Sequence, residues 1–271
     1  QYIHYVKRFS IIKFNKTLKN LGLKTNDNVL LVPELFRLGK LENVNNAEEY
    51  YSTILNTILK IIGPKGTIFI NTYTFDRSRL NKDFINETSV SSAGAFSNYI
   101  LKKKVVRSNH PVFSVSGLGK NAKTVCSNNS SHNFGYLSPY YKMMNINTKI
   151  LCLGIEMIRN PFSHVAEYFM GVPYCYNKIF KKRVIKNNKT INKKFVSFVR
   201  YLNLKFAFDI NKLEKLLIKK KILKQKKING GNISICHSVK YFDYICGILS
   251  KDIHGLLKKK PNYDLNRYPY V

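Results

Sequence analysis

Apolar residues in the first quarter of the chain recur at two alternating spacings. In residues 11–23 and 47–62 they repeat every three or four positions and the pattern stops at a glycine, which is typical of amphipathic helices. Residues 28–32 and 66–71 contain short apolar runs of the kind found in buried strands. The order helix, strand, helix, strand predicts a parallel strand pair in a sheet covered by helices on both faces.

The pattern continues along the rest of the chain. We predict further helices at 94–104, 209–224 and 241–256, and further strands at 112–115, 149–154, 183–185, 195–199 and 233–237. After residue 177 the segments become strongly basic. We therefore expect one α/β domain over 1–271, with a central mostly parallel or mixed sheet flanked by helices. Its core would span 1–177, and a smaller basic C-terminal α+β lobe would span 178–271.

Composition narrows the class of protein. With 44% hydrophobic and 13% aromatic residues, the chain is expected to be globular. It contains no apolar run of about 18 residues, so we expect no membrane span, and its start predicts no secretory signal. Five cysteines without a Cys-x-x-Cys pair favour reduced thiols and a cytoplasmic location. The sequence lacks dinucleotide, phosphate-loop and hydrolase-elbow motifs as well as metal-ligand spacing, so we predict no metal site.

The net charge of +31 changes the expected partners but not the expected fold. Residues 178–227 hold 18 basic residues, opposed only by Asp209 and Glu214. One interpretation is compositional drift, since Lys, Asn and Ile are all abundant. The other is attraction of polyanionic small molecules, an acidic membrane surface or nucleic acid.

The first candidate for chemistry is the segment Asn160 to Glu167, in which His164 and Glu167 are three residues apart. This spacing places both side chains on one face of a helical turn. A carboxylate beside an imidazole fixes its tautomer and strengthens it as a general base. The alternative is a packing histidine beside a solvated glutamate.

The second candidate is the segment Arg107-Ser108-Asn109-His110-Pro111, followed by Ser114. Its functional interpretation is an anion-binding or amide-binding loop, with Arg107 for a phosphate or carbonyl oxygen and the two serines for hydrogen bonds. The alternative is a polar turn whose backbone is set by Pro111, with Ser114 in a small core site.

Together and in this order, these segments resemble the aminoglycoside 3-N-acetyltransferase family. The resemblance rests on Leu21-Gly22-Leu23, Asp27 to Val32, Gly63 to Thr67, Arg107 to Pro111 with Ser114, Gly135, Ser138-Pro139, Leu151 to Gly154, Asn160 to Glu167, and Val172 to Tyr174. It covers roughly residues 10–180 without a break. The Arg-Ser-x-His-Pro and His-x-x-Glu elements are its specific part.

The resemblance implies acyl transfer from acetyl-CoA to an amine, with His164 as general base assisted by Glu167. The residues expected to bind acetyl-CoA are Leu35, Phe36, Arg107, Ser108, Pro111 and Ser114. Those expected to contact the acceptor are Glu34, Tyr73, His110 and Asn160.

Three positions depart from the family pattern. Val32-Pro33-Glu34-Leu35 stands where a His-Ser-Ser run is usual, Pro161 replaces a threonine, and Asn98 replaces an acidic residue. These changes leave the base in place and affect the expected pantetheine and acceptor contacts.

Because a strongly basic protein repels polycations, we expect the acceptor to be a nucleotide- or lipid-linked amino sugar used in surface polysaccharide synthesis. The basic band would then bind phosphates or rest peripherally on the inner face of the membrane. Two alternatives stay open: an inactive relative that binds anionic glycan, lipid or nucleic acid, and an acetyltransferase acting on aminoglycoside antibiotics. A nucleic-acid partner is the less favoured of the possible partners.

Overall fold

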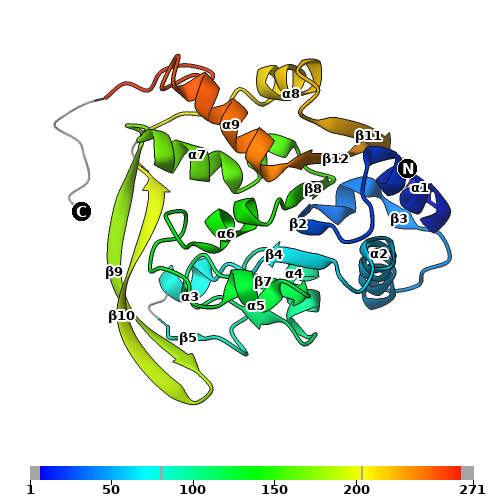
Figure 1. Ribbon diagram of the computed structural model, residues 1–271, viewed down its shortest axis with the longest axis horizontal. Coiled ribbons are helices and arrows are strands. Elements are labelled where there is room, and N and C mark those ends of the chain that lie inside the picture. The colour runs from blue at the N-terminus through cyan, green and yellow to red at the C-terminus, as the bar shows by residue number, and fades with distance from the viewer. Residues whose placement is uncertain (1–6, 80–81, 203, 264–271) are drawn as a thin grey trace, which may run out of the picture.

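A seven-stranded mixed sheet runs through the centre of the molecule (Figure 1). The computed structural model describes residues 7–79, 82–202 and 204–263. The sheet has the order β11-β12-β8-β2-β4-β7-β6. Its strands are β2 (Asn28–Pro33), β4 (Thr67–Asn71), β6 (Val106–Arg107), β7 (Val115–Gly119), β8 (Lys149–Leu153), β11 (Lys224–Ile228) and β12 (Gly231–His237). Strand β2 runs parallel to β4 and β8, and the remaining pairs are antiparallel.

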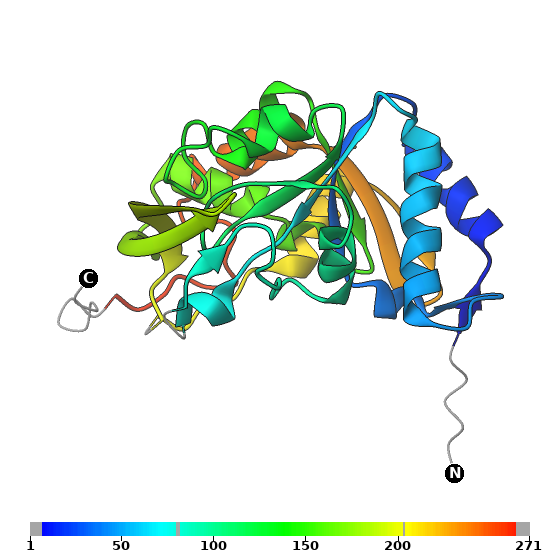
Figure 2. The same cartoon turned by 90° about the horizontal axis from the view of Figure 1, so that it is seen from below.

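Helices cover both faces of this sheet, as the turned view shows (Figure 2). One layer contains α1 (Ile11–Leu21), α2 (Ala47–Ile62) and α4 (Ala95–Leu101). The other contains α5 (Ala122–Cys126), α6 (Pro139–Asn145), α7 (Phe162–Met170), α8 (Ile210–Lys219) and α9 (Ser238–Leu249). Shorter helical segments are η1 (Leu35–Leu38), α3 (Phe75–Arg79) and η2 (Met157–Arg159).

The alternation of side chains along β2 divides the buried residues into two cores. Val29 and Leu31 pack with α1 and α2, whereas Leu30 and Val32 face the layer that contains α7 and α9. Successive strand residues point to opposite faces, so an all-apolar strand is what a sheet buried on both sides requires.

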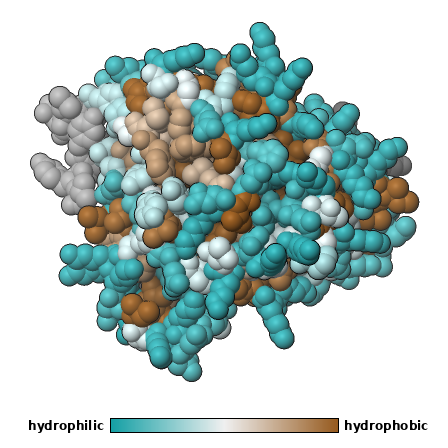
Figure 3. Space-filling model, in the orientation of Figure 1, coloured by the Kyte–Doolittle hydropathy of each residue, from teal (hydrophilic) through white to brown (hydrophobic). Residues whose placement is uncertain are grey.

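A long basic hairpin forms a second sheet at one side of the molecule (Figure 1). Its strands are β9 (Cys175–Lys186) and β10 (Lys189–Arg200), and β9 also pairs with the short β5 (Phe84–Ile85). Phe84, Val184 and Phe195 bury one part of the hairpin against β5. A small third sheet joins β1 (Arg8–Phe9) to β3 (Lys40–Leu41). The face in Figure 3 is largely hydrophilic, with scattered hydrophobic residues.

The predicted α/β class with a central mixed sheet is confirmed, and so are its helix-strand-helix-strand beginning and the parallel pairing of β2 with β4. The predicted division at 177/178 remains a prediction. Beyond residue 177, strands β11 and β12 extend the central sheet next to β8, so this part of the chain is joined to the core by backbone hydrogen bonds.

Several predicted boundaries were wrong, including those of the strands at 183–185 and 195–199, which are parts of the longer β9 and β10. The strand expected at 112–115 begins at Val115, because the His110 imidazole accepts the backbone N–H groups of Val112 and Phe113 and holds a turn there. The helix expected at 209–224 stops at Lys219, since residues from Lys224 onward pair with β12. The helix expected at 241–256 runs instead from Ser238 to Leu249.

Within the described ranges, no helix is both long and apolar enough to cross a membrane. All five cysteines are free thiols.

Candidate active site

The start of α7 is fixed by polar side chains buried beneath it. Asn160 is fully buried, and its Oδ1 accepts the N–H of Phe162 at 2.7 Å. Ser163 donates to the carbonyl of Ile158 and bonds the Tyr241 hydroxyl, both at 2.7 Å. The Asn160 side chain thus holds the start of the helix in place, and its contact with an acceptor remains a prediction.

His164 and Glu167 lie on one face of α7, as their spacing predicted. His164 Nδ1 is 2.5 Å from Glu167 Oε2. The Glu167 carboxylate is completely buried, and its other oxygen accepts the Tyr174 hydroxyl at 3.0 Å. Burial, followed by the neighbouring negative charge, raises the pKa of Tyr174 far above its usual range, so this hydroxyl remains a donor. Both oxygens of Glu167 thus have a partner.

The tautomer of His164 follows from this arrangement. A carboxylate only accepts hydrogen bonds, so Nδ1 of the imidazole must donate and Nε2 keeps its lone pair. The His164 side chain is 34% exposed. Its ring lies 5.9 Å from that of Phe134 and 6.1 Å from that of Phe208, measured between centroids. The basic nitrogen is therefore presented at the surface of the protein between aromatic neighbours.

His164 lines a cleft of about 320 Å³ at the carboxyl ends of β2 and β4. Active sites of α/β sheets commonly lie at this edge. The loop after β2 contributes Glu34, the end of β4 contributes Asn71, and Tyr73 follows it. An aromatic wall is completed by Phe75, Phe113 and Phe134. A mostly apolar cleft of this size lies at the small end of the range for small-molecule sites.

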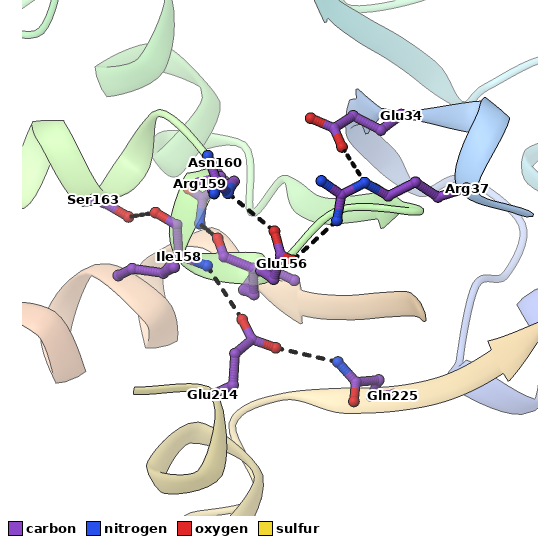
Figure 4. Close-up of polar contacts among 10 residues, drawn as sticks. Glu34, Arg37, Glu156, Ile158, Arg159, Asn160, Ser163, Glu214 and Gln225 are labelled. Carbon is purple, nitrogen blue, oxygen red and sulfur yellow. Dashed lines mark hydrogen bonds and ion pairs between the residues drawn. The ribbon is translucent and has the colours of Figure 1, made fainter. Parts of the chain in front are cut away.

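Glu34, Arg37, Glu156 and Arg159 form a network of alternating charges next to the cleft (Figure 4). Glu34 Oε2 lies 2.6 Å from Arg37 Nε, and a second Arg37 nitrogen lies 3.2 Å from Glu156. Glu156 also pairs with Arg159 at 3.0 Å. Glu34 and Arg159 line the cleft itself. Each of the two carboxylates in this network thus faces a guanidinium group, which reduces its attraction for a cationic acceptor.

The side chains of Arg107, Ser108 and Ser114 are buried inside the protein, and their contact with acetyl-CoA remains a prediction. Arg107 is 3% exposed and donates to Ser114 Oγ and to the carbonyls of Thr72, Ser89 and Asn86. Its guanidinium also lies over the Phe84 ring. Burial lowers the pKa of Arg107 to about 10, so it stays charged at neutral pH. Its donors bind protein carbonyls, which leaves this group a structural role.

The two serines of this segment are fully buried as well. Ser108 Oγ accepts the N–H of Val115 at 2.9 Å, and Ser114 Oγ donates to the carbonyl of Thr72 at 2.5 Å. Pro111 is buried, and its carbonyl accepts the hydroxyl of Thr74. These three residues make hydrogen bonds within the protein, and their contact with acetyl-CoA remains a prediction.

His110 ties this loop to the basic hairpin and does not face the cleft. It is 3% exposed, Nδ1 accepts two backbone N–H groups, and Nε2 lies 3.2 Å from the carbonyl of Val196. Burial lowers the pKa of His110 to about 4. His132 repeats the motif: its Nδ1 accepts two backbone N–H groups and its Nε2 bonds Asn177. In this structure the His110 ring bonds backbone groups, and its contact with an acceptor remains a prediction.

Leu35 and Phe36 line a different cleft from that of His164. This second cleft of about 490 Å³ is bounded by η1, β3 and the start of α2, with Tyr50 and Tyr51 among its residues. Leu35 is buried, whereas Phe36 is 77% exposed. Their contact with acetyl-CoA remains a prediction, and it would have to be made outside the cleft that contains the base.

Several residues of the site were missed by the sequence analysis. Tyr174 stands in the Val-Pro-Tyr element that contributed to the family resemblance, but nothing in the sequence paired it with Glu167. Phe134, Arg159 and Asn71 come from three segments distant along the chain and meet only in the fold. Among the described residues, no cluster of three or more His, Cys, Asp or Glu could hold a metal ion.

Comparison with known proteins gives a family and a fold. The family model described as aminoglycoside 3-N-acetyltransferase matches residues 37–250. A search of curated proteins finds no significant match.

Several solved structures share the fold. The CoASH complex of AAC-IIIb has a TM-score of 0.75 at 16% identity, covering 90% of this chain and 97% of the other. Aminoglycoside acetyltransferase AAC(3)-Xa has a TM-score of 0.76 at 15% identity, covering 92% and 94%. The YokD protein from Bacillus subtilis has a TM-score of 0.70 at 17% identity, covering 88% and 98%.

Proposed function

Because this chain belongs to the aminoglycoside 3-N-acetyltransferase family, we propose that the cleft beside His164 is where it transfers an acetyl group to the amine of an amino sugar. The protein is an acyl-CoA-dependent N-acetyltransferase, and its acyl donor is acetyl-CoA. The observation that supports the site is the His164–Glu167–Tyr174 chain, which leaves one basic nitrogen open to an apolar cleft.

The reaction needs a base, because an ammonium group has no lone pair for attack. In the proposed step, the amine nitrogen forms a bond to the thioester carbonyl carbon while His164 Nε2 takes the amine proton. Glu167 stabilises the resulting imidazolium through Nδ1. The carbon–sulfur bond then breaks, and the imidazolium returns the proton to the thiolate of CoA. The products are the N-acetylated sugar and CoA with a free thiol.

We propose a nucleotide- or lipid-linked amino sugar of surface polysaccharide synthesis as the acceptor. The protein carries a net charge of +31, and Glu34, which lines the cleft, and the neighbouring Glu156 are both paired with arginines. Polycations are repelled at long range by such a protein, whereas a phosphorylated acceptor is attracted. A cationic amine that approached Glu34 would have to compete with Arg37 for the carboxylate.

An aminoglycoside is the second candidate acceptor. The family description names this class, and two of the structural neighbours are an AAC(3)-IVa variant in complex with a gentamicin and AAC-VIa bound to sisomicin. Those ligands belong to the neighbours, which are only 15–18% identical to this chain.

The decisive experiment is CoA release from acetyl-CoA with two acceptor panels, nucleotide-linked amino sugars and aminoglycosides, using His164→Ala as the matched control. Turnover on the first panel that is lost in the variant supports the proposal. Turnover on aminoglycosides alone overturns the proposed acceptor and leaves the base assignment standing. Turnover that survives in the variant overturns the base assignment.

We also propose that the hairpin places the protein at the inner face of an anionic membrane. A hollow of about 360 Å³ is lined by Lys181, Lys193 and Lys194 among others, and Ile179 beside it is 60% exposed. Basic and apolar side chains on one surface favour anionic lipid. Co-sedimentation with phosphatidylserine vesicles, but not phosphatidylcholine vesicles, is the expected result. Equal sedimentation with both, or with neither, contradicts it.

A further inference from the structure

Asn71 stands at the carboxyl end of β4 and lines the same cleft as His164. Neither the charge pattern nor the His-x-x-Glu spacing points to this residue, and the proposed proton transfer does not use it. Acyl transfer has a second requirement besides a base. The thioester oxygen gains negative charge during attack, and a fixed hydrogen-bond donor there lowers the barrier.

The orientation of the Asn71 amide is set by a chain of two tyrosines. Tyr140 donates its hydroxyl to Asn71 Oδ1 at 2.8 Å, and the Tyr73 hydroxyl lies 2.8 Å from that of Tyr140. Because the Tyr140 hydroxyl donates its proton in the hydrogen bond to Asn71, the Tyr73 hydroxyl must be the donor in the bond to Tyr140. Burial raises the pKa of both tyrosines above the usual range, so both remain donors at neutral pH.

With its oxygen occupied, the amide has only its NH₂ group left to bond. Among the residues that the structure describes, this nitrogen has no hydrogen-bond partner. It is also absent from the set of fully buried polar atoms without a partner, so solvent can reach it. The amide nitrogen of Asn133, in contrast, is fully buried and has no hydrogen-bond partner. Asn71 is 8% exposed overall, so the small accessible part of the side chain is directed to the cleft.

The other polar side chains of the cleft are less suited to this task. Arg159 is 49% exposed and paired with Glu156, and Ser97 is 1% exposed. Glu34 carries the wrong charge to face an oxyanion. Asn71 is a neutral donor on a rigid strand end, held by Tyr140, whose ring packs on Phe134 at 5.5 Å; Phe134 in turn contacts the His164 ring.

We propose that Asn71 is a further catalytic residue, whose amide N–H groups bond the acetyl carbonyl oxygen of the thioester and stabilise it as the amine attacks. This rests on the proposed function to the extent that the acetyl group must enter the cleft beside His164. Tyr140, acting through Asn71, is a positioning residue. No electron or proton is exchanged with the amide, which only donates hydrogen bonds while His164 carries the proton.

The first test is kinetic. Asn71→Ala is expected to lower kcat by roughly 10²–10³-fold with little change in KM for acetyl-CoA, as for other single oxyanion donors. Tyr140→Phe is expected to cost less, about 10-fold, because the donor stays but loses its fixed orientation. The exposed Asn56 on α2 offers a matched control, and Asn56→Ala should stay within about two-fold of the parent. A kcat for Asn71→Ala within about three-fold of the parent overturns the proposal.

The second test needs neither an acceptor nor a base, so it separates this proposal from the proposed function. The carbonyl of acetyl-CoA labelled with ¹³C is observed by NMR in complex with each protein. A hydrogen bond moves its resonance downfield of free acetyl-CoA in the parent and in His164→Ala. The shift should be lost in Asn71→Ala with its fold intact by circular dichroism. An equal shift in the parent and in Asn71→Ala overturns the role of Asn71, whatever the acceptor proves to be.

Discussion

Two histidines of this protein show how the same side chain serves opposite purposes. His164 is 34% exposed and bonds a buried carboxylate through Nδ1, which leaves Nε2 open to the cleft. His110 is 3% exposed, and both of its nitrogens bond backbone groups. Free hydrogen-bonding capacity, and not residue type, separates a candidate base from a structural support.

Arg107 and Arg159 differ in the same way: one is buried with its hydrogen bonds used within the protein, and the other is partly exposed at the cleft. Arg107 is buried and binds carbonyl oxygens from three different residues, together with Ser114. Arg159 is 49% exposed, pairs with Glu156 and lines the cleft. The Arg107 segment therefore has a structural role inside the protein, while the α7 segment presents the reactive groups.

The strongest test of this division is the loss of His164. His164→Ala should reduce kcat by about 10³-fold, as expected for removal of a general base, while the midpoint of urea unfolding changes little because the side chain is partly exposed. His110→Ala should do the opposite: the midpoint of urea unfolding should fall clearly, while kcat should change little. Steady-state kinetics and urea denaturation of both variants check this, and a stable, fully active His164→Ala would contradict it.

The loss of Arg107 should appear as a loss of stability. Arg107→Leu removes the donors of three buried carbonyl groups, and we expect the free energy of unfolding to fall by about 3 kcal/mol. Urea denaturation measures the change. Arg159→Leu, at the exposed cleft mouth, is the matched control and should cost less than about 1 kcal/mol. Equal losses of stability in the two variants would contradict the distinction between the buried Arg107 and the exposed Arg159.

The buried His110 should make the protein less stable in mild acid. The unfolded chain takes up a proton at this residue near pH 6.5, whereas the folded protein does so only at a pKa of about 4. Between these values the unfolded state binds more protons, so stability is full above pH 6.5 and falls as the pH drops toward 4. The loss attributable to His110 is at most about 3 kcal/mol, and His132, whose pKa is also lowered by burial, acts in the same direction.

Urea denaturation from pH 7.5 to 4.5 measures this dependence, with His110→Asn as the comparison. The variant should be less stable at pH 7.5 yet lose less stability on acidification. If the parent and His110→Asn lose the same amount between these pH values, another group is responsible.

The smallest effect is expected from the loss of the Tyr174 hydroxyl, which donates a hydrogen bond to Glu167. Tyr174→Phe removes one hydrogen bond to the buried carboxylate and leaves its contact with His164 in place. We expect kcat to fall about 10-fold, by analogy with the loss of an outer partner of a functional group. Tyr241→Phe, which removes a bond to Ser163 in the same layer, should change kcat less. A kcat for Tyr174→Phe equal to that of the parent would show that Glu167 alone orients the base.

Much of the fold could be predicted because local pattern and final structure agree there. Helix α2 has the bounds that its apolar spacing predicts, and α1 lies between its cap residues Ser10 and Gly22. The predicted boundaries were wrong where other segments fix the element ends, as at Val115 and Lys219. The hydrogen bonds of His110 and the pairing with β12 cannot be read from local spacing.

The sequence by itself determined the α/β class, the pairing of His164 with Glu167 and the charge of the hairpin, because each depends on composition or on residues within one helical turn. Only the tertiary structure decided which polar groups remain open. It buried Arg107, Ser108 and Ser114, whose hydrogen bonds reach across to β4 and its neighbours, and it brought Asn71 to the cleft of His164. Burial and partner choice depend on segments far apart in the chain, so no local pattern encodes them.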